Sequence, residues 1–362
     1  MNIFITTRVS HTVFSNGLLQ NILSLKDLYK NLGHDVFFIA ESKELNNYVD
    51  HKAFNCPIFT QEELYFNNLH IDFIFHVGWD LPAEFLKKLK ERKGDFKLIS
   101  IHYGNHLFSD LYYFKEEGYS PLNSIGEDAV WTSPHFENSI PYLKSFYNTD
   151  KVFICPYIWS SCFIEEENFN LPEGLSAFYS SNRNPVALTL EPNLSPYKTA
   201  LIPLHIYKLY KEKNKLSPLN KINVACFKHL SEKTLGQRML SRIFKNLQSE
   251  INLKNRVNFV KELASDSTHI ISHQMHVGLN YIYLDAAYFN IPLIHNSDFI
   301  KDFGYYYPDF DCVEGAKKLK EAVSCHSQNI ESYKQDCANL IHKYSLTNST
   351  NINGYKELLE IS

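Results

Sequence analysis

A lysine follows a loop with two prolines in the second half of the chain. Residues 190–198 read LEPNLSPYK, where an apolar strand is expected to end and a helix to begin at Tyr197. Lys198 would then lie in the first turn of that helix, beside backbone N–H groups that have no partner within the helix. An ammonium group and such N–H groups together form a site for a phosphate or another anion. A solvated surface lysine is the alternative, and position alone leaves both open.

A carboxylate follows further along the chain, in the segment that starts at Ser272. Asn280 can cap a helix that begins there, and Asn290, followed by an isoleucine and a proline, can end it. Asp285 falls on the second turn of this helix, where its carboxylate could accept hydrogen bonds from the two hydroxyls of a ribose. A surface aspartate without a ligand is the alternative.

The first half of the chain offers two titratable side chains after expected strands. His102 ends the apolar stretch 97–102, and Asp80 follows a strand that ends at Val77. Such side chains suit general acid and base chemistry, although a histidine at a strand end is more often structural. A turn at Asn16 and Gly17 follows the first strand and leads into a helix, whose N-terminus would lie where phosphates bind in α/β proteins.

Other common chemistries find no support in the sequence. No two of the 13 glycines are separated by a single residue, so the G-x-G fingerprint of dinucleotide binders is absent. The seven cysteines show no C-x-x-C spacing, which predicts reduced thiols in place of disulfides or a zinc site. The one D-x-D triplet, at 309–311, is short enough to arise by chance. We therefore expect neither a metal site nor a cofactor.

Alternating strands and helices are expected to position these residues. In the first half, strands are expected at 2–6, 35–40, 73–77, 97–102, 129–133 and 151–156, and helices at 18–32, 82–92 and 137–147. In the second half, strands are expected at 186–190, 222–227, 256–260, 269–273 and 292–295, and helices at 197–213, 238–251, 281–289 and from 316 onward. This alternation predicts an α/β fold with two Rossmann-like parallel sheets, whose ligands bind at the carboxyl ends of the strands.

Chain length and breaks in the pattern predict two domains. A chain of 362 residues favours two domains over one or three. We expect an N-terminal Rossmann-like domain at 1–160, an interdomain connection at 161–184, a C-terminal Rossmann-like domain at 185–345 and a helix at 346–362 that can pack back on the first domain. A cleft between the two domains is the expected site.

Charge and hydropathy exclude several classes of protein. Lys and Arg number 36 against 40 Asp and Glu, a net charge of −4, so no positive field exists to gather nucleic acid. The lack of an apolar run of 18 residues and of a signal-peptide pattern predicts a cytoplasmic protein that does not span the membrane. The basic stretch 87–93 fits either a peripheral contact with an anionic membrane or a solvated helix face.

Two segments together carry a resemblance to a known family. The sequence PNLSPYK at 192–198 is similar to the G-R-L-x-x-x-K stretch of retaining GT-B glycosyltransferases, and DAAYFNIPLI at 285–294 resembles their E-A-x-x-x-G-x-P-V-I helix and strand. More closely, the chain resembles a poorly characterised bacterial family placed among these enzymes. It shares that family's N-G-L-x-Q-N at 16–21, P-Y-x-W-S at 156–160, E-P-N-x-S-x-x-K-T at 191–199, S-H-Q at 272–274, N-Y-x-Y-L-D-A at 280–286, P-L-x-H-N-S at 292–297 and G-Y-Y-Y-P-D at 304–309. The resemblance implies two Rossmann-like domains that face each other across a cleft.

The resemblance also implies roles for individual residues. Lys198 would bind the donor diphosphate, Asp285 the ribose hydroxyls, and the amides around Asn280 and Tyr281 the distal phosphate. His102 would contact the transferred sugar, and Asp80 is the candidate base. Further donor-binding candidates are Asn16, Gly17, Glu191, Asn193, Ser195, His273, Asn296 and Ser297. Two positions depart from the family pattern: Asn193 replaces the usual Arg, and Val277 replaces the first Glu of the usual E-x7-E pair.

These features predict a glycosyltransferase that moves a sugar from a nucleotide donor, such as a UDP- or GDP-sugar, to a hydroxyl of a glycan or glycolipid in surface polysaccharide or glycoconjugate synthesis. The donor is expected on the second domain and the acceptor on the first. Transfer needs no metal if a lysine, amides and a helix dipole neutralise the leaving diphosphate, and the matched signatures favour retention. Segments 227–229 and 261–263 are the expected base-recognition loops. A nucleotide-sugar epimerase or phosphorylase of the same fold, and a glycan-binding or scaffold protein without activity, are the alternatives.

Overall fold

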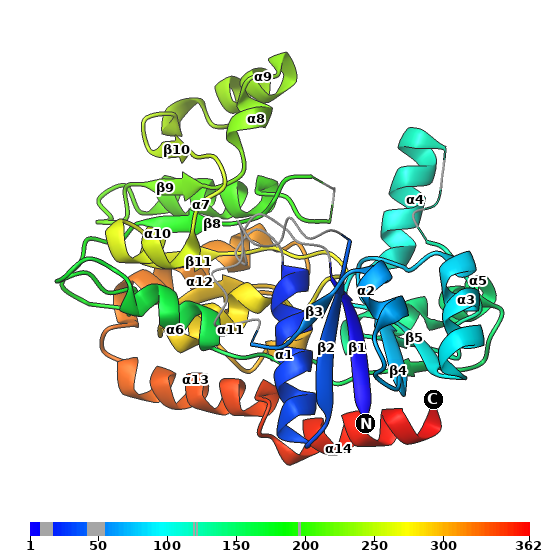
Figure 1. The fold of residues 1–362 in the computed structure, drawn as a ribbon. Coiled ribbons are helices and arrows are strands. Elements are labelled where there is room, and N and C mark those ends of the chain that lie inside the picture. Colours follow the sequence, from blue (N-terminus) through cyan, green and yellow to red (C-terminus); the bar gives the residue numbers. More distant parts are fainter. Residues whose placement is uncertain (8–16, 42–54, 119, 121, 195–196) are drawn as a thin grey trace. The chain divides into compact units, whose positions relative to one another are not determined.

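A computed structural model describes residues 1–7, 17–41, 55–118, 120, 122–194 and 197–362. Within them the chain divides into two compact units (Figure 1). The first unit comprises Met1–Phe163 and Tyr344–Ser362, and the second comprises Ile164–Lys343. Each unit is built on a parallel sheet with helices between its strands, which confirms the predicted α/β class with two Rossmann-like sheets.

The first unit holds a sheet with the strand order β3-β2-β1-β4-β5-β6-β7. Its strands are β1 (Asn2–Thr7), β2 (Asp35–Ala40), β3 (Ile58–Phe59), β4 (Phe73–His76), β5 (Lys97–His102), β6 (Ala129–Thr132) and β7 (Val152–Ile154), and all described pairs are parallel. Its helices are α1 (Gly17–Asn31), α2 (Gln61–Phe66), α3 (Ala83–Lys93), α4 (His106–Glu117), α5 (Ile140–Tyr147) and α14 (Ser349–Ile361), with a 3₁₀ helix at Pro134–Ser139.

Apolar residues on both faces of this sheet explain its strands. Ile3 and Ile5 of β1 belong to one core cluster and Phe4 to another. Burial on both faces is typical of a parallel sheet covered by helices on each side. Gly78, after β4, has a φ of +71°, and a side chain there would collide with Leu18 of α1. The glycine thus lets the start of α1 approach the end of β4.

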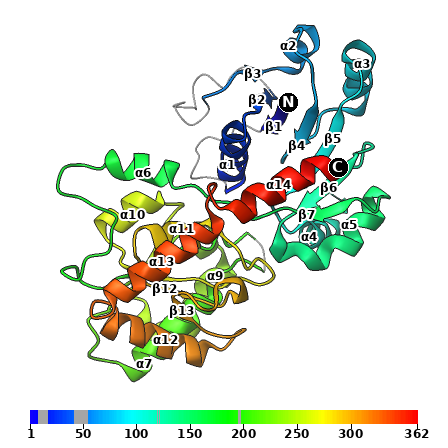
Figure 2. The same ribbon diagram turned by 90° about the horizontal axis from the view of Figure 1, so that it is seen from below.

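Helix α14 belongs to the core of the first unit (Figure 2). Tyr355 is fully buried in the cluster that holds Ile3, and its hydroxyl donates to the Pro156 carbonyl at 2.9 Å. At the other end of the helix, the Trp131 indole N–H donates to the Ser362 hydroxyl at 3.0 Å. The last residues of the chain therefore complete the unit that its first residues begin.

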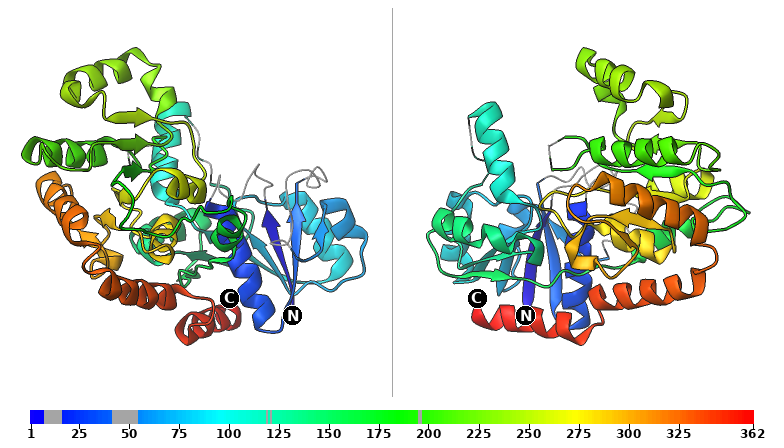
Figure 3. Two further views of the ribbon diagram at one scale, coloured as in Figure 1. Left: turned by 90° about the vertical axis from the view of Figure 1, so that its left-hand side faces the viewer. Right: turned by 180° about the vertical axis from the view of Figure 1, so that it is seen from behind.

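The second unit holds a sheet with the strand order β10-β9-β8-β11-β12-β13. Its strands are β8 (Ala187–Thr189), β9 (Ile222–Val224), β10 (Ile251–Leu253), β11 (His269–Ile271), β12 (Leu293–His295) and β13 (Tyr305–Tyr306), and all described pairs are parallel. Its helices are α7 (Leu201–Lys213), α8 (Lys228–Ser231), α9 (Thr234–Ile243), α10 (Phe259–Ser265), α11 (Tyr281–Tyr288), α12 (Cys312–Cys325) and α13 (Ile330–Tyr344), with 3₁₀ helices at Lys245–Leu247 and Asp298–Ile300. Helices α7 and α12 pack against each other (Figure 3).

The strand expected at 256–260 and the helix expected at 238–251 differ in the structure. Residues 256–260 are not a strand, because the Asn258 side chain accepts from the Lys261 N–H at 3.0 Å and starts α10 at the next residue. The strand at this sheet edge is β10, which lies where the helix 238–251 was expected to end. The segment predicted as the interdomain connection contains α6 (Cys162–Phe169).

Candidate functional site

Polar side chains follow three neighbouring strands of the second sheet at their carboxyl ends. Glu191 comes two residues after β8, segment 272–274 directly follows β11, and segment 296–297 directly follows β12. Because these three strands are adjacent and parallel, the segments lie at one edge of the sheet. In open α/β sheets this edge is the one that binds ligands.

Glu191 is the centre of a buried hydrogen-bond network at this edge. Its side chain is buried, and its carboxylate accepts from the Ser272 hydroxyl at 2.6 Å, the Gln274 amide at 2.7 Å and the His273 backbone N–H at 3.3 Å. Burial raises the pKa of Glu191, while these donors and the Lys198 ammonium oppose the rise. The carboxylate thus joins the loop after β8 to the loop after β11.

Lys198 is held beside this network by its neighbours in the chain. The Tyr197 carbonyl, one residue earlier, accepts from the Met275 N–H at 3.2 Å. Burial lowers the pKa of Lys198, and the charge of Glu191 opposes that shift. The expected place of Lys198 in the first turn of a helix is wrong, because α7 begins at Leu201 and the lysine lies in the preceding loop.

Asn193 shapes this loop and explains the late start of α7. Its φ is +57°, its side-chain oxygen accepts from the Ala200 N–H at 2.7 Å, and its side-chain N–H donates to the Glu191 carbonyl at 2.7 Å. The Asn193 side chain therefore binds the backbone of its own loop. Ser195, also predicted as a donor-binding residue, lies outside the described residues.

His273 lies against two aromatic rings of the segment that follows β13. Its Nδ1 is 3.0 Å from the Tyr307 hydroxyl oxygen, and its ring lies 4.8 Å from that of Phe310, centroid to centroid. Burial lowers the pKa of His273 to about 4, so the imidazole is neutral at pH 7. A neutral imidazole at this edge can make hydrogen bonds but carries no charge for a phosphate.

Asn296 and Ser297 fix the loops of this edge to one another. The Asn296 side chain accepts from the Gln274 N–H and donates to the Gln274 carbonyl, both at 2.9 Å. The Ser297 hydroxyl donates to the Gly278 carbonyl, and its backbone N–H donates to His295 Nδ1 at 3.1 Å. Both residues thus hold the loops at the carboxyl edge of the sheet through protein contacts.

Helix α11 begins where the sequence predicts, at Tyr281. The Asn280 side chain accepts from the Ile282 N–H at 3.4 Å and forms its N-cap. Tyr281 and Asp285 are both buried, and Asp285 lies on the second turn. The predicted ribose contact of Asp285 and the phosphate contact of the α11 amides stay predictions.

His102 ends β5 in the first unit and is buried. Its Nε2 lies 3.0 Å from the Tyr147 hydroxyl, and its ring contacts that of His106 with centroids 4.1 Å apart. Burial and the neighbouring His106 hold the pKa of His102 well below its usual value. The imidazole therefore suits neutral hydrogen bonding better than proton transfer at pH 7.

Asp80 follows β4 in the same unit, and its carboxylate oxygen lies 3.5 Å from His76 Nδ1. This contact is not a charged pair at pH 7, because burial lowers the pKa of His76 to about 4. Gly17 is the first residue of α1, and its predicted partner Asn16 lies outside the described residues. The catalytic roles of His102 and Asp80 stay predictions.

The described residues contain no group of three His, Cys, Asp or Glu side chains that could hold a metal ion. The Asp311 carboxylate of the D-x-D triplet accepts from the Val313 and Glu314 N–H groups and caps α12. In the part of the chain that the structure describes, no helix is long and apolar enough to cross a membrane.

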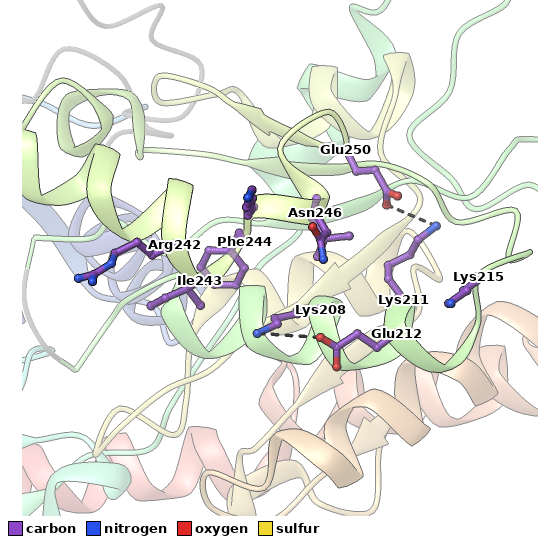
Figure 4. A pocket seen from close by; sticks show the side chains of 11 residues that line it. Lys208, Lys211, Glu212, Lys215, Arg242, Ile243, Phe244, Asn246 and Glu250 are labelled. Atoms are coloured by element: carbon purple, nitrogen blue, oxygen red, sulfur yellow. Dashed lines mark ion pairs between the residues drawn. The ribbon is translucent and has the colours of Figure 1, made fainter.

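A separate cavity of about 480 Å³ lies in the second unit (Figure 4). It is at the amino ends of the strands, next to Glu250 before β10, and thus at the edge opposite the carboxyl edge. Its lining residues come from the end of α7 and from the segment before β10: Lys208, Lys211, Glu212, Lys215, Arg242, Ile243, Phe244, Lys245, Asn246, Leu247 and Glu250. Lys211 pairs with Glu250 at 3.3 Å and Lys208 with Glu212 at 4.0 Å. No motif in the sequence predicted this cavity, and none of its lining residues is among those predicted to bind the donor.

Comparison with models of protein families shows which family the chain belongs to. Residues 2–359 match the model of a family described as "Protein of unknown function (DUF2827)". The chain belongs to this family. A search among curated proteins finds no match for this DUF2827 protein.

Solved structures with the same fold as the DUF2827 protein include several glycosyltransferases. A glycosyltransferase from Rickettsia africae is similar over 100% of this chain and 99% of its own, with 15% identity and a TM-score of 0.57. HepE of Anabaena, solved with UDP-glucose, is similar over 99% and 100%, with 10% identity and a TM-score of 0.60. An alpha-glucosyltransferase solved with UDP and a 13-mer DNA is similar over 99% of both chains, with 13% identity and a TM-score of 0.63. These likenesses confirm the predicted GT-B fold of the DUF2827 protein.

Sequence reasoning missed two residues of the site. Gln274 binds Glu191 directly, and Tyr307 binds His273, yet neither was singled out for chemistry. Both lie within segments that carried the family resemblance, S-H-Q and G-Y-Y-Y-P-D, which was the available signal. The two expected base-recognition loops are helical in this DUF2827 protein, since 228–231 form α8 and 261–263 lie within α10.

Proposed function

We propose that this protein is a glycosyltransferase that transfers a sugar from a nucleotide-sugar donor to a hydroxyl of a glycan or glycolipid. The observation that carries the proposal is the position of Lys198 in the loop after β8, beside the buried Glu191 network at the carboxyl edge of the second sheet, in a GT-B fold. Glycosyltransferases of this fold have been solved with UDP or a UDP-sugar bound. More specifically, we propose that the transfer retains the configuration of the sugar and serves surface polysaccharide or glycoconjugate synthesis.

Lys198 supplies the charge that the leaving diphosphate needs. Departure of a nucleoside diphosphate builds negative charge on the phosphate oxygens, and a fixed cation in a partly dry site stabilises this charge without reorganising solvent. Glu191 favours the charged form of the lysine at this position. The N–H groups at the start of α11 add the positive end of a helix dipole.

The other proposed contacts of the donor come from the second unit. Asp285 would accept hydrogen bonds from the ribose hydroxyls, and Asn280 would keep the first turn of α11 oriented toward the distal phosphate. Glu191, Asn193, Asn296 and Ser297 would act through the loops that they hold. His102 and Asp80 of the first unit are proposed to contact the transferred sugar and the acceptor.

Binding of the donor is tested first by thermal denaturation with UDP-, GDP- and CMP-sugars. A ligand that binds only the folded protein stabilises it by about 2.7 kcal/mol when present at 100 times its Kd, and so raises the melting temperature. A rise with one class of nucleotide sugar supports a transferase or an epimerase, and product analysis with and without a glycan acceptor separates the two. No rise with any nucleotide sugar would contradict the proposal and favour a glycan-binding protein.

The role of Lys198 is tested by Lys198→Ala. We expect the transfer rate to fall on the order of 10²-fold, the loss typical of removing one group that stabilises a developing negative charge. Lys215→Ala is the matched control, because Lys215 is an exposed lysine of the same unit that lines the cavity at the opposite edge. Equal rates for Lys198→Ala and the unchanged protein would refute the assignment.

A further inference from the structure

The hydrogen bonds of His273 fix which ring nitrogen carries its proton. The Tyr307 hydroxyl donates to the Ser272 carbonyl at 3.0 Å, which uses the only proton of that hydroxyl. His273 Nδ1 lies 3.0 Å from the same hydroxyl oxygen, so this nitrogen must carry a proton and donate it. Since the buried imidazole is neutral at pH 7, it holds one proton only. Nε2 is therefore an unprotonated acceptor.

This acceptor is buried and lacks a partner. His273 is 2% exposed, and its Nε2 makes no hydrogen bond to any residue that the structure describes. The side-chain oxygen of the next residue, Gln274, is in the same state, with a residue exposure of 5%. Most buried polar atoms in proteins have a partner, so two adjacent residues with unpaired acceptors call for a hydrogen-bond donor from beyond the described residues.

These two acceptors lie beside groups of the proposed substrate site, so a substrate bound there is our candidate for the hydrogen-bond donor. Gln274 donates its amide to Glu191, and the next residue, Met275, donates its N–H to the carbonyl that precedes Lys198. A phosphate or diphosphate carries only acceptor oxygens and cannot satisfy Nε2. A hydroxyl carries a proton to donate, and a nucleotide sugar carries hydroxyls on both its ribose and its hexose.

We propose that His273 Nε2 accepts a hydrogen bond from a hydroxyl of the nucleotide sugar, and that Tyr307 is a positioning residue that fixes the tautomer for this contact. The inference rests on the proposed function. It makes His273 a specificity-determining residue, because a donor without the matching hydroxyl leaves a buried acceptor unpaired. It also divides the edge into a charged part at Lys198 for phosphate and a neutral part at His273 for a hydroxyl.

The variant His273→Asn separates the two ring nitrogens. An asparagine amide N–H can occupy the place of Nδ1 and still donate to Tyr307, but nothing replaces Nε2. We expect about tenfold weaker binding of the complete donor, the cost of one neutral hydrogen bond. Tyr307→Phe removes the acceptor for Nδ1–H and keeps the aromatic ring. The imidazole then becomes a mixture of tautomers, so we expect a smaller loss of affinity for the donor than in His273→Asn.

The hydroxyl is identified with donors that each lack one hydroxyl group. The probes are UDP-glucose, its 2-, 3-, 4- and 6-deoxy hexose analogues and its 2′-deoxyribose analogue, or the GDP-mannose equivalents if only GDP-mannose raises the melting temperature. For one analogue we expect the unchanged protein to bind about tenfold more weakly than it binds the complete donor. His273→Asn should bind that analogue and the complete donor equally. This non-additivity is the signature of a direct contact. Purely additive losses for every analogue would overturn the inference and leave the proposed function standing.

Nitrogen NMR of the protein with ¹⁵N-labelled histidine gives a second readout that does not depend on turnover. The His273 signals are assigned by their loss in His273→Asn, and at pH 7 we expect a protonated Nδ1 and an unprotonated Nε2. Addition of the binding nucleotide sugar should shift Nε2 alone. An unshifted Nε2 with saturated donor, or a protonated Nε2 in the free protein, would overturn the inference. If no nucleotide sugar binds, the proposed function fails and this inference fails with it.

Discussion

Glu191→Ala should destabilise the second unit strongly, because it removes the acceptor of three buried donors. The Gln274 amide and the His273 N–H lose their partner, and the Ser272 hydroxyl keeps only its contact with the Tyr283 hydroxyl oxygen at 3.3 Å. Each unsatisfied buried donor costs about 1–3 kcal/mol, and removal of one partner from a buried charged network costs about 3–5 kcal/mol in total. We expect a loss of the free energy of unfolding in that range.

The assay is calorimetric or fluorescence-detected thermal unfolding. For a unit of this size a loss of 1 kcal/mol lowers the melting temperature by roughly 2–4 °C, so Glu191→Ala should lower it by roughly 6–20 °C. Glu212→Ala is the matched control, since that glutamate is exposed and pairs with Lys208 only at 4.0 Å. Its effect should stay within about 0.5 kcal/mol. A loss below about 1 kcal/mol for Glu191→Ala would refute the network as a source of stability.

The variant Glu191→Gln tests the direction of the pKa shift. Burial raises the pKa of Glu191 in the folded protein above its usual value of 4.5, so the folded state holds this proton more tightly than the unfolded chain. The contribution of Glu191 to stability is therefore complete below the unfolded pKa and declines as the pH rises through the folded pKa. The free energy of unfolding, taken relative to Glu191→Gln, should fall as the pH rises above about 4.5, by about 1.4 kcal/mol for each pH unit that separates the folded pKa from the unfolded pKa. A rise over this range would show that the donors and Lys198 outweigh burial.

Two further predictions concern packing. Tyr355→Phe keeps the ring but leaves the Pro156 carbonyl without its donor at 2.9 Å, so denaturant unfolding of the first unit should show a loss of about 1–2 kcal/mol; an unchanged midpoint would contradict the role of this bond. Gly304→Ala adds a Cβ 2.9 Å from the Leu293 carbonyl oxygen at a φ of +67°, and should cost at least about 2 kcal/mol in thermal unfolding. The control is Gly174→Ala, at a φ of +81° with open space around it, and an equal loss there would assign the effect to φ alone.

Long apolar runs made most of the fold predictable from the sequence. The strands at 35–40 and 97–102 have the predicted bounds, because each is a mostly buried run that begins at an exposed charged residue. The prediction of a strand at 256–260 was wrong because this short segment, RVNFV, mixes polar and apolar residues in a pattern that fits a strand or the start of a helix. The hydrogen bond of the Asn258 side chain to the start of α10 decides between them.

The candidate site was predictable in its members but not in its contacts. Lys198 and His273 stood out by residue type and by their places near strand ends. The pairing of Glu191 with segment 272–274 depends on β8 lying next to β11, an order that strands far apart in the sequence do not reveal. The loop position of Lys198 depends on the left-handed backbone of Asn193, whose side chain delays α7 until Leu201.

The return of α14 to the first sheet has a consequence for the making of the protein. Trp131 and its partner Ser362 are separated by 231 positions, and the whole second unit lies between Phe163 and Tyr344. Because domains tend to fold as their segments leave the ribosome, the second unit can complete itself while the first still lacks a helix of its core. The unit that is synthesised first is therefore expected to be the last to finish folding, with the apolar surface that receives Tyr355 uncovered until translation of α14 is complete.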